Sequence, residues 1–226
     1  MRVQGQVRFS SARMVNMETS MNQASSEIVK EIMDNSDRLD CTIEEVDEAT
    51  VLDVGINVRG TEKLGQLVAE IAMGGCGVVK LSKASFGDLN LPVTIAATDM
   101  PTRAIICSQI ADWEIEVGDF AAVASGPAKA LAQTRSFLGE TNCDEISDSG
   151  VILLDTRQTP TPEVIAYLAK RCGISPSGLF CILSPTASKV GSIRIASRIL
   201  EAGILKACKL GFHPHKVRSV YGVAPI

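Results

Sequence analysis

Short apolar runs alternate with helical patterns along most of this 226-residue chain. The runs at residues 50–57, 151–155 and 179–184 are rich in Val, Ile and Leu, which is typical of strands. Residues 61–73 and 160–172 instead repeat apolar side chains with the period of a helix. Strands that alternate with helices predict an α/β fold, here with mixed α+β character.

The remaining elements follow from the same patterns. They are helices at residues 25–39, 101–111 and 128–133, and strands within 41–49 and at 78–82, 92–98, 117–124 and 216–223. Residues 1–22 lack the apolar core of a signal peptide, and we expect them to be disordered. Residues 134–149 are polar and acidic, which indicates a surface connection at a domain boundary. We therefore expect a first domain at residues 23–145 and a second at residues 150–226.

The composition narrows the class of protein. Hydrophobic residues make up 46% of the chain, aromatic residues only 4% and charged residues 21%, which predicts a soluble domain with an aliphatic core. The net charge of −4 argues against a general nucleic-acid binder, because such proteins need a basic surface for phosphates. No apolar run approaches the roughly 20 residues of a membrane span.

The chain has seven cysteines and two histidines. The odd number of cysteines and the absence of a CxxC pair leave no zinc-ligand spacing, so we expect no metal site. Most of the cysteines lie in apolar runs, where we interpret them as small buried side chains. A reducing cytoplasm is the simplest compartment for such a chain.

Residues 184–206 carry the strongest candidate site. The pattern predicts a strand end, a polar loop and a helix on which Arg198 and Glu201 are neighbours, since they are three residues apart. A carboxylate beside a guanidinium can position and deprotonate a water molecule. On the pattern alone, a surface ion pair worth about 0.2–0.5 kcal/mol is the simpler interpretation.

Two other places carry candidate ligand contacts. Ser125, Gly126 and Pro127 precede a predicted helix, whose free amide groups could bind an anion, and Lys129 adds a charge there. A plain junction between strand, turn and helix explains the same residues. Asp53 lies on a predicted strand, where it could face a ligand or stabilise the following turn. Both alternatives stay open for each place.

Residues 185–206, PTASKVGSIRIASRILEAGILK, resemble the PTAS–GS–R–E block of archaeal methenyltetrahydromethanopterin cyclohydrolases. Other blocks resemble that family in the same order: TVLDVGINVRG (50–60), AMGGCG (72–77), ASGPAKALA (124–132) and the ending YGVAPI. The resemblance covers about residues 25–226. Members of the family continue past the GVAPI element, so the resemblance implies a chain truncated at its C-terminus, with an incomplete second domain.

The resemblance implies an activity and an architecture. The activity is the reversible hydrolysis of methenyl-tetrahydromethanopterin to its 5-formyl form, in one-carbon metabolism and methanogenesis. It implies no cofactor, because the pterin carrier is the substrate and its reacting carbon already lies in a cation. It further implies two α/β domains with the pocket between them, a homotrimer and a cytoplasmic enzyme whose partner is a small pterin, neither a nucleic acid nor a membrane.

The resemblance also implies residue roles. Arg198 and Glu201 match the family's catalytic pair, and we expect Glu201 to be the base that Arg198 orients. The residues implied in substrate binding are Ser125, Gly126, Pro127, Thr186, Ser188, Gly191, Ser192 and Arg194. Capping of the helix by Ser188 or Ser192 is the alternative for these two. Many relatives carry Gln at position 194, and we interpret Arg194 mainly as a solvated surface residue that could contact the substrate's anionic tail. Ile110 stands where many relatives carry Lys.

Two other functions compete with the cyclohydrolase. The chain could be a non-catalytic fragment that binds the pterin without turnover. It could also be a nucleotide-binding transferase that uses the Ser125-Gly126-Pro127 loop. The absence of a GxxxxGK[ST] phosphate loop counts against this transferase.

Overall fold

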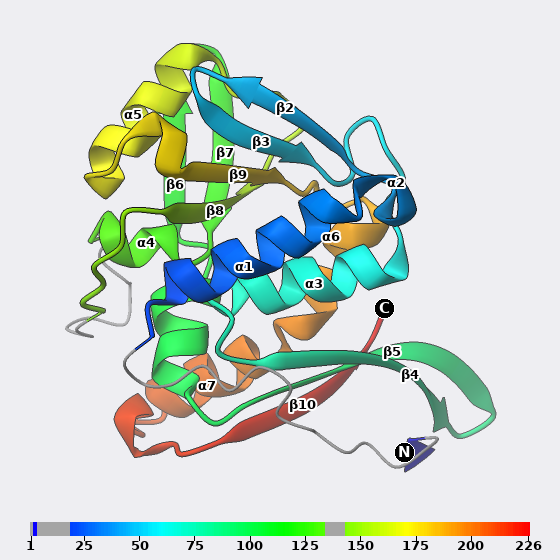
Figure 1. Ribbon diagram of the computed structural model, residues 1–226. Helices are drawn as coiled ribbons and strands as arrows, with labels where there is room; N and C mark the ends of the chain where they lie inside the picture. Colours follow the sequence, from blue (N-terminus) through cyan, green and yellow to red (C-terminus); the bar gives the residue numbers. More distant parts are fainter. Residues whose placement is uncertain (1, 4–18, 134–142) are drawn as a thin grey trace.

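The computed structural model describes residues 2–3, 19–133 and 143–226, which form two β-sheets with helices packed around them (Figure 1). The larger sheet contains, in spatial order, β2 (Thr42–Val46), β3 (Ala49–Asp53), β9 (Leu179–Leu183), β8 (Gly150–Asp155), β7 (Phe120–Ser125) and β6 (Trp113–Val117). The smaller sheet contains β1 (Arg2–Val3), β4 (Val78–Phe86), β5 (Leu89–Thr98) and β10 (Val220–Pro225). This mixture of helices and sheets confirms the predicted α/β class.

The centre of the larger sheet is parallel. Strand β9 pairs in parallel with β3 on one side and with β8 on the other, so Phe180 lies opposite both Thr50 and Val151. Antiparallel hairpins extend the sheet at both edges, β2 with β3 and β6 with β7. The carboxyl ends of the three parallel strands therefore meet at one edge of the sheet.

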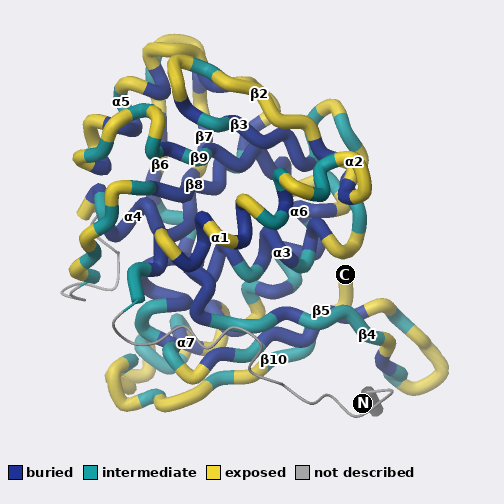
Figure 2. Tube along the Cα trace, in the orientation of Figure 1, coloured by how far each residue is buried: buried dark blue, intermediate teal, exposed yellow. Residues whose placement is uncertain are grey.

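Helices pack on both faces of the larger sheet and between the two sheets. They are α1 (Met21–Asp34), α2 (Ser36–Leu39), α3 (Glu62–Ala72), α4 (Ala128–Leu131), α5 (Pro162–Cys172), α6 (Lys189–Ser197) and α7 (Ile199–Lys209), with the π-helix η1 (Thr102–Gln109) and the 3₁₀ turns η2 (Pro176–Gly178) and η3 (Pro214–Lys216). Successive side chains of a strand point to opposite faces. Val151 and Leu153 accordingly pack with α1 and α3, whereas Ile152 and Leu154 pack with α5. Figure 2 shows the central strands β8 and β9 as the most completely buried part of the sheet.

The smaller sheet is joined to this body by a further apolar cluster. Val79 and Ala96 of its central hairpin pack against η1, the ends of α1 and α3, and Leu200 of α7. Strand β10 runs along β5 and brings the end of the chain to the edge of this sheet (Figure 1). The helices α6 and α7 thus lead from the larger sheet to the smaller one.

Several boundaries differ from the sequence prediction. Helix α1 begins at Met21, so residues 21 and 22 are helical and not disordered, while most of the predicted disordered segment lies outside the described residues. The predicted strand at residues 117–124 lies within a hairpin, because Gly118 turns the chain with a φ of 58°. The single helix predicted within residues 184–206 is interrupted at Arg198, which separates α6 from α7.

The two sheets do not follow the predicted domain boundary. Strands β8 and β9 come from the predicted second domain, yet they lie between β3 and β7 of the predicted first domain. Strand β10 likewise joins a sheet whose other strands precede residue 100. The division into 23–145 and 150–226 stays a prediction about folding units, and residues 134–142 of the predicted connection lie outside the described residues.

The cysteines follow the prediction only in part. Cys41, Cys76, Cys172 and Cys181 are buried free thiols, as predicted, and Cys208 is half-buried. Cys107 and Cys143 form a disulfide, which was not predicted from the sequence. The fold brings their Cα atoms to 5.5 Å although 36 positions separate them, and such a pairing leaves no signal in local spacing. None of the described helices is long and apolar enough to cross a membrane.

Candidate functional site

The predicted site lies at the carboxyl ends of the parallel strands. The chain leaves β3 at Asp53, β9 at Leu183 and β8 at Asp155, and hydrogen bonds tie these exits together. Val54 donates its amide to the carbonyl of Leu183 at 3.1 Å. In open α/β sheets ligands bind at this edge, in the loops beyond the carboxyl ends of the strands.

The loop of residues 185–188 is fixed by two glycines from separate sequence blocks. A Cβ atom at Gly55 would lie 2.5 Å from the side chain of Ser188, and one at Gly191 would overlap the carbonyl oxygen of Pro185. Ser188 accepts the Gly191 amide at 2.9 Å and donates to the Pro185 carbonyl at 2.8 Å. Ser188 therefore caps α6, and the capping alternative is observed for this residue.

The side chain of Asp53 stabilises the turn that directly follows it in the chain. Its carboxylate accepts the amides of Gly55 at 2.9 Å, Ile56 at 2.7 Å and Asn57 at 2.8 Å. These three bonds hold the loop that contacts Ser188. Of the two roles left open by the sequence, the structure shows stabilisation of the turn.

Arg198 and Glu201 form a bidentate ion pair across the break between α6 and α7. The Nε and Nη2 atoms of Arg198 donate to the two carboxylate oxygens of Glu201, each at 2.6 Å. Glu201 is only 7% exposed, whereas the side chain of Arg198 is 26% exposed. The burial of the carboxylate excludes a simple solvent-exposed ion pair. Burial lowers the pKa of Arg198, but the hydrogen bond and charge of Glu201 outweigh it and raise the pKa overall.

Arg194 is not a surface residue, so that interpretation is wrong. It is 2% exposed, and its Nη2 donates to Asp155 Oδ2 at 3.2 Å and to the carbonyl of Ser184 at 3.0 Å. The helix face that carries Arg194 turns toward the sheet, where the carboxylate of Asp155 receives the charge. Burial lowers the pKa of Arg194, and the negative charge of Asp155 counteracts this effect.

Asp155 is a site residue that the sequence reading missed. Its carboxylate accepts the amide of Thr186 at 3.1 Å, and it accepts the hydroxyl of Thr186 as well as Arg194. It thereby joins β8 to the exposed loop after β9. The signal was present in the sequence: Asp155 is a single carboxylate at the end of an otherwise apolar strand.

The Ser125-Gly126-Pro127 loop lies in the interior. Gly126 donates its amide to the carbonyl of Ser108 at 2.8 Å, and the carbonyl of Pro127 accepts the side-chain amide of Asn22 at 3.1 Å. All three loop residues are buried. These hydrogen bonds hold the loop against η1 and α1, and the predicted substrate contact there stays a prediction.

Lys129 brings a buried cation to the same region. It is 3% exposed, donates to the carbonyl of Ile110 at 2.5 Å and forms an ion pair with Asp112. Burial lowers the pKa of Lys129, while Asp112 and the nearby charge of Glu201 oppose that effect. A lysine ammonium therefore reaches the backbone carbonyl of Ile110.

Three ion pairs thus form one electrostatic group, which we call the three-pair cluster. Its members are Asp112–Lys129, Glu201–Arg198 and Asp155–Arg194. Glu201 and Arg198 influence the ionisation of both Lys129 and Arg194, so the pairs lie within electrostatic reach of one another. The cluster is neutral overall. It contains a buried carboxylate, that of Glu201, held by the guanidinium of Arg198.

Comparison with known proteins decides the family. The sequence profile described as Cyclohydrolase (MCH) matches residues 20–226, which is nearly the whole chain. The chain belongs to the methenyltetrahydromethanopterin cyclohydrolase family. A protein of that name from Methanocaldococcus jannaschii is 35% identical over 212 residues, and one from Methanococcoides burtonii is 32% identical over 209 residues. Each alignment covers 92% of this chain but only 66% and 65%, respectively, of the relative.

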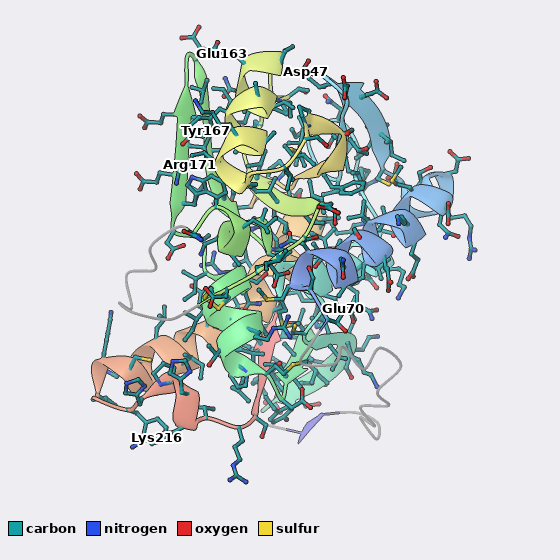
Figure 3. The ribbon with its side chains drawn as sticks, turned by 60° about the vertical axis from the view of Figure 1, so that its left-hand side comes forward. Asp47, Glu70, Glu163, Tyr167, Arg171 and Lys216 are labelled. Carbon is teal, nitrogen blue, oxygen red and sulfur yellow. A yellow bond between two sulfur atoms is a disulfide. The ribbon has the colours of Figure 1, made fainter. Side chains whose placement is uncertain are left out.

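Two buried side chains, Gln109 and Trp113, flank Asp112 of the cluster in the sequence. Gln109 ends η1, and neither of its amide atoms has a hydrogen-bond partner among the described residues. Trp113 is buried, and the guanidinium of Arg171 lies 5.7 Å from the centre of its ring. Figure 3 shows Arg171 on the same helix, α5, as Tyr167. Trp113 thus packs beneath α5.

Metal ligands do not gather in the part of this cyclohydrolase-family chain that the structure describes. Within residues 2–3, 19–133 and 143–226, no three His, Cys, Asp or Glu side chains come together in a way that could hold an ion.

Proposed function

We propose that the chain hydrolyses methenyl-tetrahydromethanopterin to 5-formyl-tetrahydromethanopterin, reversibly. The observation that carries the proposal is the buried carboxylate of Glu201, held by both nitrogens of Arg198 at 2.6 Å. Membership of the cyclohydrolase family supports it, as do the names of the relatives.

The reaction makes modest demands on the protein. Glu201 takes a proton from a water molecule as the water oxygen bonds to the methenyl carbon. The C–N bond of the ring then breaks: the hydroxyl proton leaves as the formyl C=O forms, the freed nitrogen gains a proton, and one proton is released overall. Arg198 holds both carboxylate oxygens of Glu201 in place through two hydrogen bonds. The carbon is already electrophilic in the amidinium cation, so we propose that no cofactor takes part.

The substrate contacts are proposed along the loop and the start of α6. Thr186 is exposed and Ser188 and Ser192 are half-buried at this rim. Their hydroxyls donate to Asp155, to the Pro185 carbonyl and to the Ser188 carbonyl, respectively, so we propose that they line the pocket and offer lone pairs to the substrate. Gly191 lets the loop close onto the helix. Ser125, Gly126 and Pro127 are proposed to shape the pocket from the interior side. Arg194 is buried beneath the loop, and we propose that it acts through Asp155 and not on a substrate tail.

We further propose a homotrimer located in the cytoplasm, with a role in methanogenic one-carbon metabolism. The metabolic role is supported by the relatives named methenyltetrahydromethanopterin cyclohydrolase in Methanocaldococcus jannaschii and Methanococcoides burtonii. The trimer and the compartment rest on the family resemblance. The Cys107–Cys143 disulfide runs against a reducing compartment. Light scattering on a sizing column tests the trimer, and mass spectrometry of alkylated protein from cells tests whether the disulfide forms there.

The decisive experiment follows the near-ultraviolet absorbance of the methenyl substrate after mixing with protein. We expect rapid loss with the wild type and at least a hundredfold lower kcat for Glu201→Gln. Glu163→Gln is the matched control, because it removes an exposed carboxylate on α5. If Glu201→Gln retains most of the kcat, Glu201 is not the base. If the wild type is inactive, the reaction assignment fails.

The length of the relatives makes the non-catalytic, pterin-binding fragment the alternative to test. Because the chain spans 65–66% of those proteins, it can bind the pterin and still lack turnover. A rise in melting temperature with the pterin, without loss of absorbance, would identify this binding fragment. A rise with ATP alone would instead indicate the nucleotide-binding transferase.

A further inference from the structure

We infer that Asp155 is a positioning residue of the proposed hydrolysis. It neutralises the charge of Arg194 and fixes the loop that carries Thr186. A cationic substrate then meets the guanidinium of Arg198, whose charge Glu201 compensates, and is not repelled by Arg194. The inference rests on the proposed function, because it is the methenyl substrate that is cationic. It adds a residue to which neither the sequence nor the relatives assign a role.

The geometry makes Asp155 a junction between a buried cation and an exposed loop. One carboxylate oxygen, Oδ1, accepts the Thr186 amide at 3.1 Å. The other, Oδ2, accepts both the Thr186 hydroxyl and Arg194 Nη2. The carboxylate is 29% exposed, while Arg194 lies almost fully buried below it. A single side chain thus controls the placement of the loop and the charge beneath it.

Arg194 needs this partner. A buried charge without a counter-charge is strongly unfavourable, because the protein interior solvates it poorly. The carbonyl of Ser184 supplies a hydrogen bond to Arg194 but only a partial charge. The Nε of Arg194 has no hydrogen-bond partner among the described residues. The full negative charge beside this guanidinium comes from Asp155.

The position of Arg194 explains why its charge matters for the reaction. Arg194 and Arg198 are four residues apart on consecutive helical turns, and the positive charge of Arg198 contributes to lowering the pKa of Arg194. Asp155 also acts on Arg198. The other charged groups of this region are Glu201, Lys129 and Asp112 of the three-pair cluster. Removing the charge of Asp155 leaves the cluster with one net positive charge, which repels a cation but not a neutral ligand.

The test compares a cationic and a neutral ligand that are otherwise alike. The dissociation constants of methenyl- and formyl-tetrahydromethanopterin are measured by calorimetry in a Glu201→Gln background, which slows interconversion. This background leaves the three-pair cluster with one net positive charge, and Asp155→Asn adds a second. Adding Asp155→Asn is expected to weaken the cationic methenyl ligand about tenfold and the neutral formyl ligand less than threefold. Adding Arg194→Gln as well is expected to restore the original ratio. The difference is expected to shrink at high salt, since salt screens charges.

Two single variants separate charge from shape. Arg194→Gln alone removes the cation, and we expect the methenyl ligand to bind at least as tightly as before. Thr186→Val removes a hydroxyl from the same carboxylate without changing charge, so it should weaken both ligands equally. Equal weakening of both ligands by Asp155→Asn, or weaker methenyl binding by Arg194→Gln, would overturn the inference.

Failure of the proposed function has a different signature. If neither ligand binds the parent protein, the reaction assignment falls, and the role of Asp155 in it falls too. The ion pair itself is then tested by urea unfolding of Asp155→Asn, Arg194→Gln and the double variant. We expect the double variant to have a higher urea midpoint than Asp155→Asn, because it no longer buries an unpaired guanidinium.

Discussion

Gly191 lies directly against the carbonyl of Pro185, with no room for a side chain between them. This contact closes the loop of residues 185–188 onto the first turn of α6. Gly191→Ala should therefore lower the free energy of unfolding by about 1–3 kcal/mol, since the backbone must shift. Urea unfolding measures this change.

Gly203 provides the matched control on the next helix. A Cβ atom there meets nothing within 4 Å, so Gly203→Ala should raise stability by about 0.4–1 kcal/mol. An equal loss of stability in both variants would contradict the proposed close contact.

The bidentate geometry of Arg198 leads to a second prediction. Lys keeps the positive charge but cannot offer two parallel N–H groups to Glu201. We expect Arg198→Lys to lower kcat at least tenfold in the absorbance assay, with a smaller change in KM. Lys206→Arg changes an exposed cation on α7 and should leave both constants unchanged. Wild-type kcat in Arg198→Lys would show that charge alone suffices.

The disulfide predicts how many thiol groups of the protein react with a thiol reagent. The chain has seven cysteines, and two are joined in the disulfide, which leaves 7 − 2 = 5 free thiols. In the folded protein only the half-buried Cys208 should react rapidly with a thiol reagent, because the other four are buried. Denaturation should reveal five reactive thiols, and reduction followed by denaturation seven. Seven thiols without reduction would show that Cys107 and Cys143 are not bonded.

Stability should fall in alkaline solution. Burial raises the pKa of Cys172 from 9.0 to about 12, so the folded state holds this proton where the unfolded state has lost it. The stabilisation is complete below pH 9 and is lost as the pH rises toward 12, by up to about 1.4 kcal/mol per pH unit. Cys76 acts in the same direction, with its pKa raised to about 11. Urea unfolding between pH 8 and pH 10.5 measures the slope.

The control for this slope is a pair of substitutions. Cys172→Ser removes a titrating group but keeps a donor for the carbonyl of Ala128, so the slope should become shallower. Cys208→Ser changes a half-buried thiol and should leave the slope as it was. A slope that is the same in all three proteins would rule out Cys172 as its source.

The sequence predicted the elements whose signals are local. Helix α5 begins with the Thr161 cap and Pro162, and it ends at Gly173 with a φ of 68°, all visible in neighbouring residues. The pair Arg198–Glu201 was found for the same reason, because three positions on one helix suffice to bring the side chains together.

The features that were missed depend on distant partners. Arg194 is buried because Asp155, 39 residues earlier, supplies its counter-charge, and no local pattern encodes that meeting. Lys129 and Asp112 likewise join across the hairpin β6–β7. The disulfide also joins Cys107 to a residue 36 positions away. Charged side chains on an otherwise apolar helix are therefore poor guides to which face is exposed.

The order of strands in the larger sheet has a consequence for the newly made chain. Strand β9 lies between β3 and β8, yet it is synthesised after both of them, and long after β3. Until it leaves the ribosome, β3 and β8 each lack a neighbour, and their unpaired edges are open to association with other chains. Parallel pairing between such distant segments is slow to form. The residues that carry the proposed chemistry follow β9 directly, so the site is completed only when the centre of the sheet closes.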